Sequence, residues 1–395
     1  MSEATEHTPQ APMPGVLEGN LKEPIRLTGI ELNGISAEAS NKGGTVRIWT
    51  RLFMTSEERL FHRIVKSLAS HIELRASQAG HPVSIEKTGF TLLVIHPDNT
   101  ADLWADAAAV VIQAQMKRPV QAGAVVFEAD ITDIIAMSFP LVPIETGDRV
   151  VCIFREGWRF ALFLDCNPEG HLSVADMERD LGTLSRRLKY TEIYEAIEND
   201  DLFKGLIDSG WFPFAEIMGA EFVQLSMRSE AKLDLDDVEA ALTSKFDSAR
   251  LEQMFARWMT KPHFAGKEKL LRSALTGFSN GDPVHVLKIA LTEIEGILND
   301  AYRKRHGKGA KLKKLLEFAI LSAEEKTGQP HSLMFPTAFA RYLREYTFAD
   351  FDPAARNGKA GSRHAVGHGA AESDSYTLAR ALQALLTVDQ LAFYT

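Results

Sequence analysis

The pattern of apolar and polar positions divides the chain into a strand-rich part and a helix-rich part. Residues 45–53 alternate and are rich in β-forming side chains, so they predict a strand, and residues 90–95 predict a second one. Between them, Thr55 and Glu58 form a capping-box pattern, which predicts the start of a helix. Residues 107–116 fit either a helix or a buried strand, because periodicity alone does not separate the two in a short apolar run.

A β-hairpin is the clearest local feature of the first half. Residues 150–154 and 158–164 form two apolar runs, and Gly157 in the short connection supplies the positive φ that a tight turn requires. The aromatic side chains of the hairpin are either a platform on which nucleobases stack or core residues, and the packing preference of β-forming residues favours the core. They are Phe154, Trp158, Phe160 and Phe163. Residues 173–188 and most of residues 190–261 then follow a helical pattern.

From residue 282 onward the pattern is helical throughout. Asp282 and Pro283 have the residue types of a helix N-cap and first position, and an apolar stripe follows at steps of three and four residues. The stripe consists of Leu287, Leu291, Ile294 and Leu298. Further helices are predicted over residues 311–326 and 337–346, then a short one from Arg363 and a last one capped by Ser373 and Asp374. Together these segments predict an antiparallel bundle of about four or five helices.

We therefore expect an α+β fold with four parts. Residues 1–24 are expected to form a disordered tail, residues 25–190 a mixed α/β domain, residues 191–281 a helical connector and residues 282–395 an all-α bundle. No apolar run reaches the ~18 to 20 residues of a membrane span, so we expect no membrane partner. The tail carries Glu and Pro where a secretory signal has its apolar segment. Cys152 and Cys166 lie in or beside apolar strand-like runs, which is typical of reduced thiols in a cytoplasmic protein.

The net charge of −9 argues against a general nucleic-acid-binding protein, but the charge is unevenly distributed. Residues 264–395 hold 18 Lys and Arg against 14 Asp and Glu, a net of +4, and the rest of the chain carries −13. Phosphates are neutralised by local charge, so this basic part permits RNA binding. Its candidate RNA-binding residues are Arg303, Lys304 and Arg305. The alternative, which such runs favour, is a solvated helix end where cations interact with the helix dipole.

One short segment concentrates cationic and titratable side chains among small and apolar residues. It lies at residues 363–369, directly before the last predicted helix, and places Arg363, His364 and His368 together. An arginine, then Asn, Asp or His, then three variable residues and a histidine are the signature of the HEPN superfamily, and residues 282–394 resemble a domain of that superfamily. The acidic first-helix segment of a prokaryotic branch of this family is similar to residues 294–298.

The resemblance implies a metal-independent endoribonuclease, as in bacterial anti-phage defence and toxin-like proteins that are regulated by their N-terminal region. Attack of a ribose 2′-OH requires a base, an acid and a cation, and histidine and arginine supply these groups at neutral pH. By analogy His368 is the acid or base, Arg363 holds the phosphate and His364 fills the supporting polar position. Five residues rotate by about 140° along a helix. Since one copy of the motif is evident, the resemblance implies a homodimer in which two motifs meet and leave a cyclic phosphate product.

Other interpretations remain open at this stage. In a non-catalytic HEPN-like module that binds RNA or nucleotide, or that dimerises, Arg363 and His368 would stabilise the bundle. His364 and His368 have the spacing of a zinc-binding pair, but no third ligand is apparent, and no Walker-type loop is present, so we predict neither metal nor cofactor. Glu295 at the edge of the apolar stripe either orients Arg363 or is a solvated helix residue, whereas Glu293 is expected on the solvent side.

Overall fold

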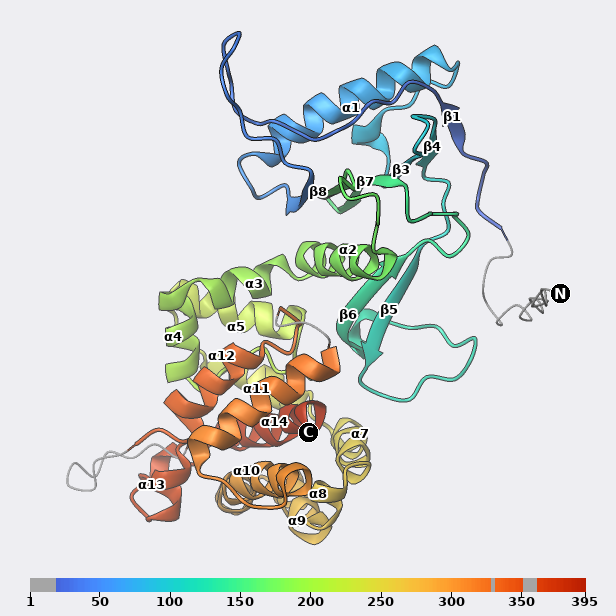
Figure 1. Cartoon of the computed structure of the whole chain (residues 1–395). Coiled ribbons are helices and arrows are strands. Elements are labelled where there is room, and N and C mark those ends of the chain that lie inside the picture. Colours follow the sequence, from blue (N-terminus) through green and yellow to red (C-terminus); the bar gives the residue numbers. More distant parts are fainter. Residues whose placement is uncertain (1–18, 328–330, 351–360) are drawn as a thin grey trace, which may run out of the picture. The chain divides into compact units, whose positions relative to one another are not determined.

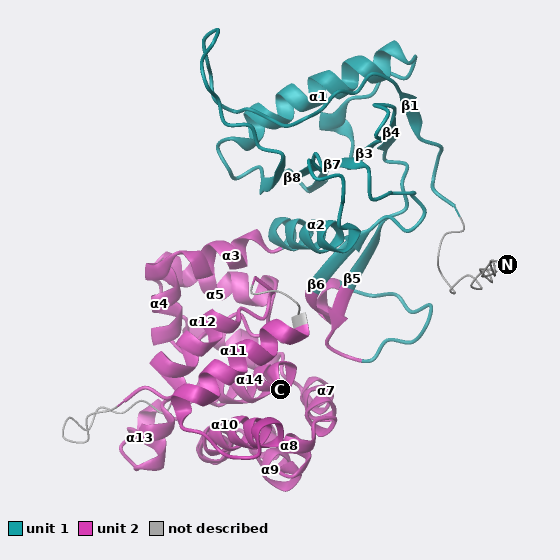
Figure 2. Ribbon diagram, viewed as in Figure 1, with its two compact units in different colours: residues 1–113, 119–127, 134–189 teal, residues 114–118, 128–133, 190–395 magenta. Residues whose placement is uncertain are grey.

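The computed structural model of the chain describes residues 19–327, 331–350 and 361–395 (Figure 1). The chain divides into two compact units, one with residues 1–113, 119–127 and 134–189 and the other with residues 114–118, 128–133 and 190–395 (Figure 2). The fold belongs to the predicted α+β class. Most of the tail predicted over residues 1–24 lies outside the described residues. Within the described ranges, no helix has both the length and the apolar character needed to cross a membrane.

The first unit is built around a six-stranded antiparallel sheet. Its strands follow the order β1 (Ile25–Leu27), β4 (Ala101–Ala105), β3 (Phe90–Ile95), β7 (Arg149–Glu156), β8 (Arg159–Asp165) and β2 (Arg51–Thr55). The prediction of a strand at β3 and of a hairpin at β7 and β8 is confirmed, with Gly157 at φ +60° in the turn. The strand predicted over residues 45–53 is displaced. β2 begins at Arg51, and Trp49 forms only an isolated bridge with Ile35.

Helices cover both faces of this sheet. α1 (Phe61–Gln78) packs on one face and α2 (Val174–Lys189) on the other, and each encloses a separate apolar core. Because successive residues of a strand point to opposite faces, Leu93 of β3 lies in the α1 core and Leu92 in the α2 core. The same alternation places Cys166 in the first core and Cys152 in the second, both as buried free thiols.

Two local predictions in this unit need correction. The backbone N–H of Thr55 donates to Glu58 Oε1 at 3.1 Å, but this contact closes a turn before the helix, and α1 itself begins at Phe61. A short 3-10 turn, η1 (Ile85–Lys87), follows α1. In the hairpin, Phe154 and Phe163 are buried as predicted, but Trp158 is 70% exposed, because it lies at the turn end of the hairpin, at the margin of the sheet face that α1 covers.

The ambiguous segment 107–116 forms a strand at its end. β5 (Val111–Met116) pairs with β6 (Ile131–Ser138) in a separate two-stranded sheet, and the 3-10 turn η2 (Glu128–Asp130) precedes β6. This strand is not buried, since Val111 and Ile112 are both more than 40% exposed. Residues 114–118 and 128–133 of this ribbon belong to the second unit.

The second unit consists mainly of helices. They are α3 (Thr191–Glu198), α4 (Asp200–Asp208), α5 (Ala220–Glu230), α6 (Asp236–Ser244), α7 (Ser248–Met259), α8 (Pro262–Ala265), α9 (Glu268–Ser279), α10 (Pro283–His306), α11 (Leu312–Thr327), α12 (Pro336–Tyr342), the π-helical turn η3 (Leu343–Thr347), α13 (Arg363–Gly367), the 3-10 turn η4 (Ser373–Ser375) and α14 (Leu378–Tyr394). Asp282 caps α10 as predicted, because its carboxylate accepts from the backbone N–H of His285 at 3.0 Å. All four residues of the predicted stripe are buried.

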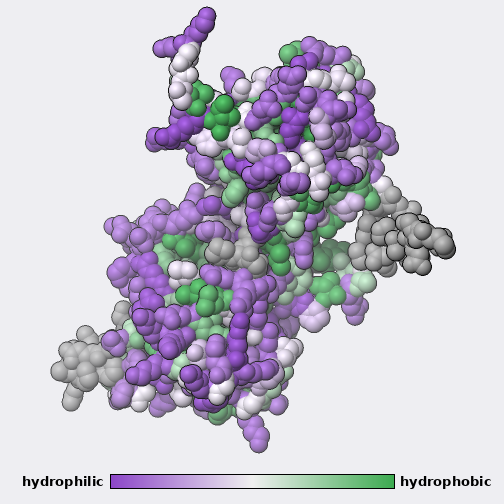
Figure 3. Space-filling view, in the orientation of Figure 1, coloured by the Kyte–Doolittle hydropathy of each residue, from purple (hydrophilic) through white to green (hydrophobic). Residues whose placement is uncertain are grey.

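α14 is the central helix of this unit. Every residue from Ala381 to Tyr394 is buried, and the helix packs against α6, α7, α9, α10 and α11. Its predicted cap is wrong: Ser373 and Asp374 lie in η4, and the Thr377 hydroxyl accepts from the backbone N–H of Arg380 instead. The visible outer face of the second unit is mainly hydrophilic, with hydrophobic residues in small separate groups (Figure 3).

Candidate functional site

The motif segment forms the one-turn helix α13. Its N-cap is Ser362, whose hydroxyl donates to the carbonyl of Ala349 at 2.8 Å and accepts from the backbone N–H of Ala365 at 3.4 Å. The helix ends after Gly367, and His368 occupies the C-cap position. Ala365 is fully buried, and α13 packs against α10. The motif is thus held by a side-chain cap at its start and by apolar packing along one side.

An ion pair connects the motif to α10. Arg363 Nη2 lies 2.8 Å from Glu295 Oε2, and the two side chains are 33% and 32% exposed. Of the two roles open to Glu295, the structure therefore places it beside Arg363. Glu293, two positions earlier, is not on the solvent side as expected: its side chain is only 13% exposed and pairs with Lys267 Nζ at 2.7 Å.

The two motif histidines differ in exposure. His364 is half-buried, whereas His368 is exposed at the end of the helix and its backbone N–H donates to the carbonyl of His364 at 3.0 Å. Arg363 and His368 are five positions apart, which on a helix corresponds to a rotation of about 140°. His368 is thus exposed as a residue, and the side chain of Arg363 is partly exposed beside Glu295.

The basic residues predicted to bind RNA lie in the last turn of α10. Arg303 Nη1 is 3.3 Å from Asp300 Oδ1, and Arg305 donates two hydrogen bonds, of 2.7 and 2.8 Å, to the carboxylate of Glu325. Lys304 is exposed beside them. The helix ends where Gly307 adopts φ +74°. The position at a helix C-terminus agrees with the solvated-end interpretation, and RNA contact by these residues stays a prediction.

Comparisons of this chain with protein-family models, with curated proteins and with solved structures give no match. Over the part of the chain that the structure describes, no group of three or more His, Cys, Asp and Glu residues is placed to hold a metal ion. The chemistry that the motif can offer is that of imidazole and guanidinium side chains.

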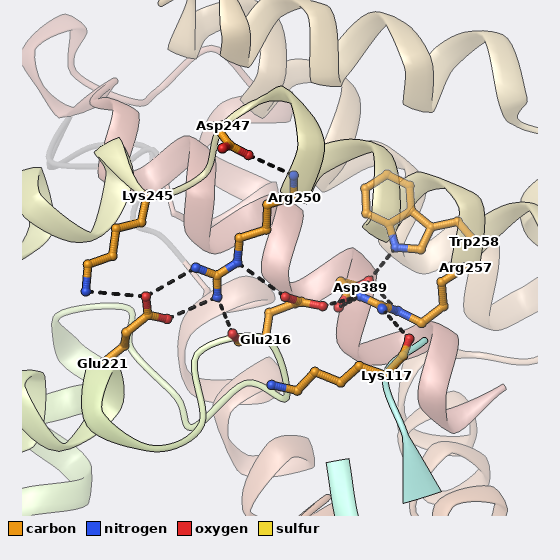
Figure 4. Close-up of polar contacts among 9 residues, drawn as sticks. All are labelled: Lys117, Glu216, Glu221, Lys245, Asp247, Arg250, Arg257, Trp258 and Asp389. Atoms are coloured by element: carbon orange, nitrogen blue, oxygen red, sulfur yellow. Dashed lines mark hydrogen bonds and ion pairs between the residues drawn. The ribbon is translucent and has the colours of Figure 1, made fainter. Parts of the chain in front are cut away.

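A second polar cluster was not anticipated from the sequence (Figure 4). Its centre is Asp389 of α14, whose side chain is 1% exposed and accepts hydrogen bonds from three donor atoms of two residues. Arg257 of α7 donates from Nη2 at 2.8 Å to each carboxylate oxygen and from Nε at 3.1 Å, and Trp258 Nε1 donates at 2.7 Å. Arg257 Nη2 also donates to Glu216 at 2.5 Å. The buried carboxylate of Asp389 and the largely buried carboxylate of Glu216 therefore share one guanidinium that is 10% exposed.

The cluster continues along α7 through a second arginine. The carboxylate of Asp247 caps this helix by accepting from the backbone N–H of Arg250 at 2.9 Å. The Arg250 side chain donates to Glu221 at 3.0 and 3.2 Å and to Glu216, and Lys245 Nζ lies 3.5 Å from Glu221 (Figure 4). One sequence signal marks this cluster: Asp389 is an acid within the apolar pattern of the last helix, and a buried carboxylate requires a partner.

Burial and the neighbouring charges determine the ionisation of the two shared carboxyls. Burial raises the pKa of Asp389 to about 6, against the attraction of Arg257. Burial also opposes ionisation of Glu216, but the neighbouring Arg257, Lys117 and Arg250 together lower its pKa. Both groups are consequently negative at neutral pH, and Arg257 is the cation that they share.

Proposed function

We propose that the helices of the second unit form a metal-independent endoribonuclease of the HEPN kind. The observation that carries this proposal is the pairing of Arg363 with Glu295 at 2.8 Å at the start of a short helix whose C-cap is the exposed residue His368. A phosphate-binding guanidinium benefits from a fixed orientation, and the partial exposure of Arg363 leaves donors for a ligand. The signature spacing of the motif is the second line of support.

The proposed reaction is transesterification of the RNA backbone. A base removes the proton of a ribose 2′-OH, the 2′ oxygen bonds to the adjacent phosphorus, and the bond from phosphorus to the 5′ oxygen breaks. An acid returns a proton to that leaving oxygen, so the products are a 2′,3′-cyclic phosphate and a 5′-hydroxyl. His368 acts as acid or base, and Arg363 stabilises the charge of the pentacoordinate phosphorane. His364 supports the site, and Glu295 is a positioning residue because it acts through Arg363.

The proposal includes a homodimer. One motif offers one exposed histidine and one guanidinium, whose five-residue spacing corresponds to about 140° on a continuous helix, whereas the reaction uses an acid and a base together. A second copy of the chain would supply the missing groups. We further propose, from the resemblance of the motif alone, that the enzyme acts in anti-phage defence or a toxin-like system under control of its N-terminal region.

Cleavage of RNA in EDTA tests the proposal. Purified wild type should cut a long single-stranded RNA and leave 2′,3′-cyclic phosphate ends, and His368→Ala should lose at least ~100-fold in rate. His81→Ala, which removes an exposed histidine of the first unit, is the matched control and should cut like wild type. Circular dichroism and light scattering would check that each variant keeps its fold and its association state.

Three results would contradict the proposed function. They are equal activity of His368→Ala and wild type, cleavage that needs added metal, and cleavage of the DNA oligonucleotide of the same sequence, which has no 2′-OH. Binding of RNA by the wild type without any cleavage would favour the second candidate, a non-catalytic module. The pairing of Arg363 with Glu295 is compatible with such a module, because an ion pair between two helices also stabilises their packing.

A further inference from the structure

The second unit contains a cavity of about 380 Å³ beside the Arg257 cluster. Four cations line it: Lys117 and Arg118 from the ribbon after β5, and Arg250 and Arg257 from α7. Small-molecule sites commonly begin at ~300 Å³, so the cavity is large enough for a compact ligand. It lies in the second unit and shares no residue with the Arg363 motif.

The arginines of this cavity each have a carboxylate partner. Arg118 donates from Nε and Nη2 to both oxygens of Asp130, at 2.6 and 2.7 Å. Arg250 pairs with Glu221, and Arg257 with Glu216 and the buried Asp389. These pairs fix the planes of the three guanidinium groups before any ligand arrives, which reduces the entropy lost on binding.

Lys117, the fourth cation of the cavity, has no carboxylate partner among the described residues. No carboxylate of the described residues lies within ion-pair distance of its ammonium group, although its backbone carbonyl accepts from Arg257 Nη1 at 2.8 Å. The side chain extends toward Arg250 and Glu216 (Figure 4). Burial lowers the pKa of Lys117, and the positive charges of Arg250 and Arg257 lower it further, against the attraction of Glu216 and Asp389. The ammonium thus lies in a cavity that disfavours its charge.

An anion bound in the cavity would favour the charged form of Lys117. The residues that line the cavity include four cations (Lys117, Arg118, Arg250 and Arg257) and three carboxylates (Asp130, Glu216 and Glu221), so the lining carries one excess positive charge. Lysine and arginine together are the side chains with which proteins hold phosphate groups, the lysine as a point charge and the arginines as planar donors. We propose that this cavity binds a phosphate-bearing small molecule whose anionic group lies against Lys117. The ligand is either free phosphate or a nucleoside monophosphate.

Calorimetric titration of the full chain with inorganic phosphate and with adenosine 5′-monophosphate tests the proposal. Wild type should bind at least one of the two saturably at one site, and Lys117→Gln should weaken that binding by about tenfold or more. Lys117→Arg, which keeps the positive charge, should bind within a few-fold of wild type. Lys288→Gln, which removes an exposed lysine of α10, is the matched control and should leave binding unchanged. Tighter binding of the nucleotide than of phosphate identifies a nucleotide as the ligand, and the reverse order identifies free phosphate.

A second measurement needs no substitution. Amine-specific labelling of the wild type, read by mass spectrometry, should show that the bound probe slows modification of Lys117 and leaves Lys288 unaffected. The proposal is overturned if neither probe saturates, if Lys117→Gln binds as tightly as wild type, or if Lys117 is labelled at the same rate with and without the probe. Because both readouts are made without RNA, their outcome is independent of the proposed nuclease activity.

Discussion

Replacement of Arg257 by methionine isolates the contribution of the buried cluster to stability. Methionine keeps most of the apolar stem that packs in the unit but removes the guanidinium. Asp389, at 1% side-chain exposure, then has only the Trp258 N–H as a donor, and Glu216, at 9%, loses its 2.5 Å contact. Removing one partner of a buried ion pair costs about 3–5 kcal/mol, since the remaining charge is left uncompensated. We expect a loss in this range at pH 8.

The loss should depend on pH in a defined direction. The pKa of Asp389 is already raised to about 6 by burial, and Arg257 opposes that rise. Without the guanidinium the pKa values of both Asp389 and Glu216 rise, so near neutral pH the folded variant binds more protons than its unfolded chain. Stability increases on acidification whenever the folded state binds more protons. The deficit of Arg257→Met relative to wild type should therefore narrow as the pH falls from about 8 to about 5.

Hydrogen exchange across a urea series measures this effect locally. A chain with two compact units need not unfold in one step, so the free energy is read from peptides of α7 and α14, with the labelling pulse at one fixed pH. Arg272→Met is the matched control, because its ion pair with Glu252 joins side chains that are 43% and 58% exposed and should contribute less than about 1 kcal/mol. A loss for Arg257→Met as small as that of the control, or a deficit that widens on acidification, would refute the reasoning.

Two further substitutions test other parts of the structure. Burial and three neighbouring lysines lower the pKa of His263 to about 4, so the folded state binds fewer protons than the unfolded chain between pH 6.5 and 4 and loses stability as the pH falls through that window. His263→Gln should lose less stability than wild type between pH 7 and 5 in thermal unfolding, and an unchanged difference would contradict this. Gly182→Ala would place a Cβ 2.6 Å from the Cα of Ala136, so the first unit should lose about 2 kcal/mol in urea unfolding. Gly266→Ala meets nothing closer than 4.0 Å and should behave like wild type.

The elements that the sequence predicted correctly are those determined by neighbouring residues. β3 and the hairpin around Gly157 are apolar runs bounded by turn residues, and the α10 cap needs only Asp282 and Pro283. Failures occurred where two local signals compete. Thr377 and Ser373 are both acceptable cap residues, and the choice of Thr377 depends on where α14 packs, which is a tertiary effect. The exposure of Trp158 likewise depends on how far α1 covers its face of the sheet.

The Arg363 motif and the Lys117 cavity also differ in whether neighbouring residues or distant ones determine them. The motif at Arg363 is contiguous in sequence, and its distant partner Glu295 was recognisable because it lies at the edge of a regular apolar stripe. The cavity at Lys117 has no such signature. Its contacts join Lys117 to Arg257 across 140 residues and Arg257 to Asp389 across 132, and periodicity within a segment carries no information about such pairings.

An acidic residue at a buried position of a helix nevertheless predicts a contact with another part of the chain. Asp389 is the one acidic residue of the largely apolar helix α14, and a carboxylate that is buried in a core requires a cation or a set of hydrogen-bond donors. This requirement predicts that Asp389 has a cation or hydrogen-bond donors beside it, but it does not identify which residues supply them. Here the partner Arg257 is held between two carboxylates, and one of them, Glu216, also accepts a hydrogen bond from Arg250. Lys117 lines the same cavity as Arg257. The buried acid Asp389 requires the cation Arg257, and Arg257 lines the cavity that contains Lys117. The need for charge compensation in the core thus connects a single acidic residue of the sequence to the cavity that we propose binds an anion.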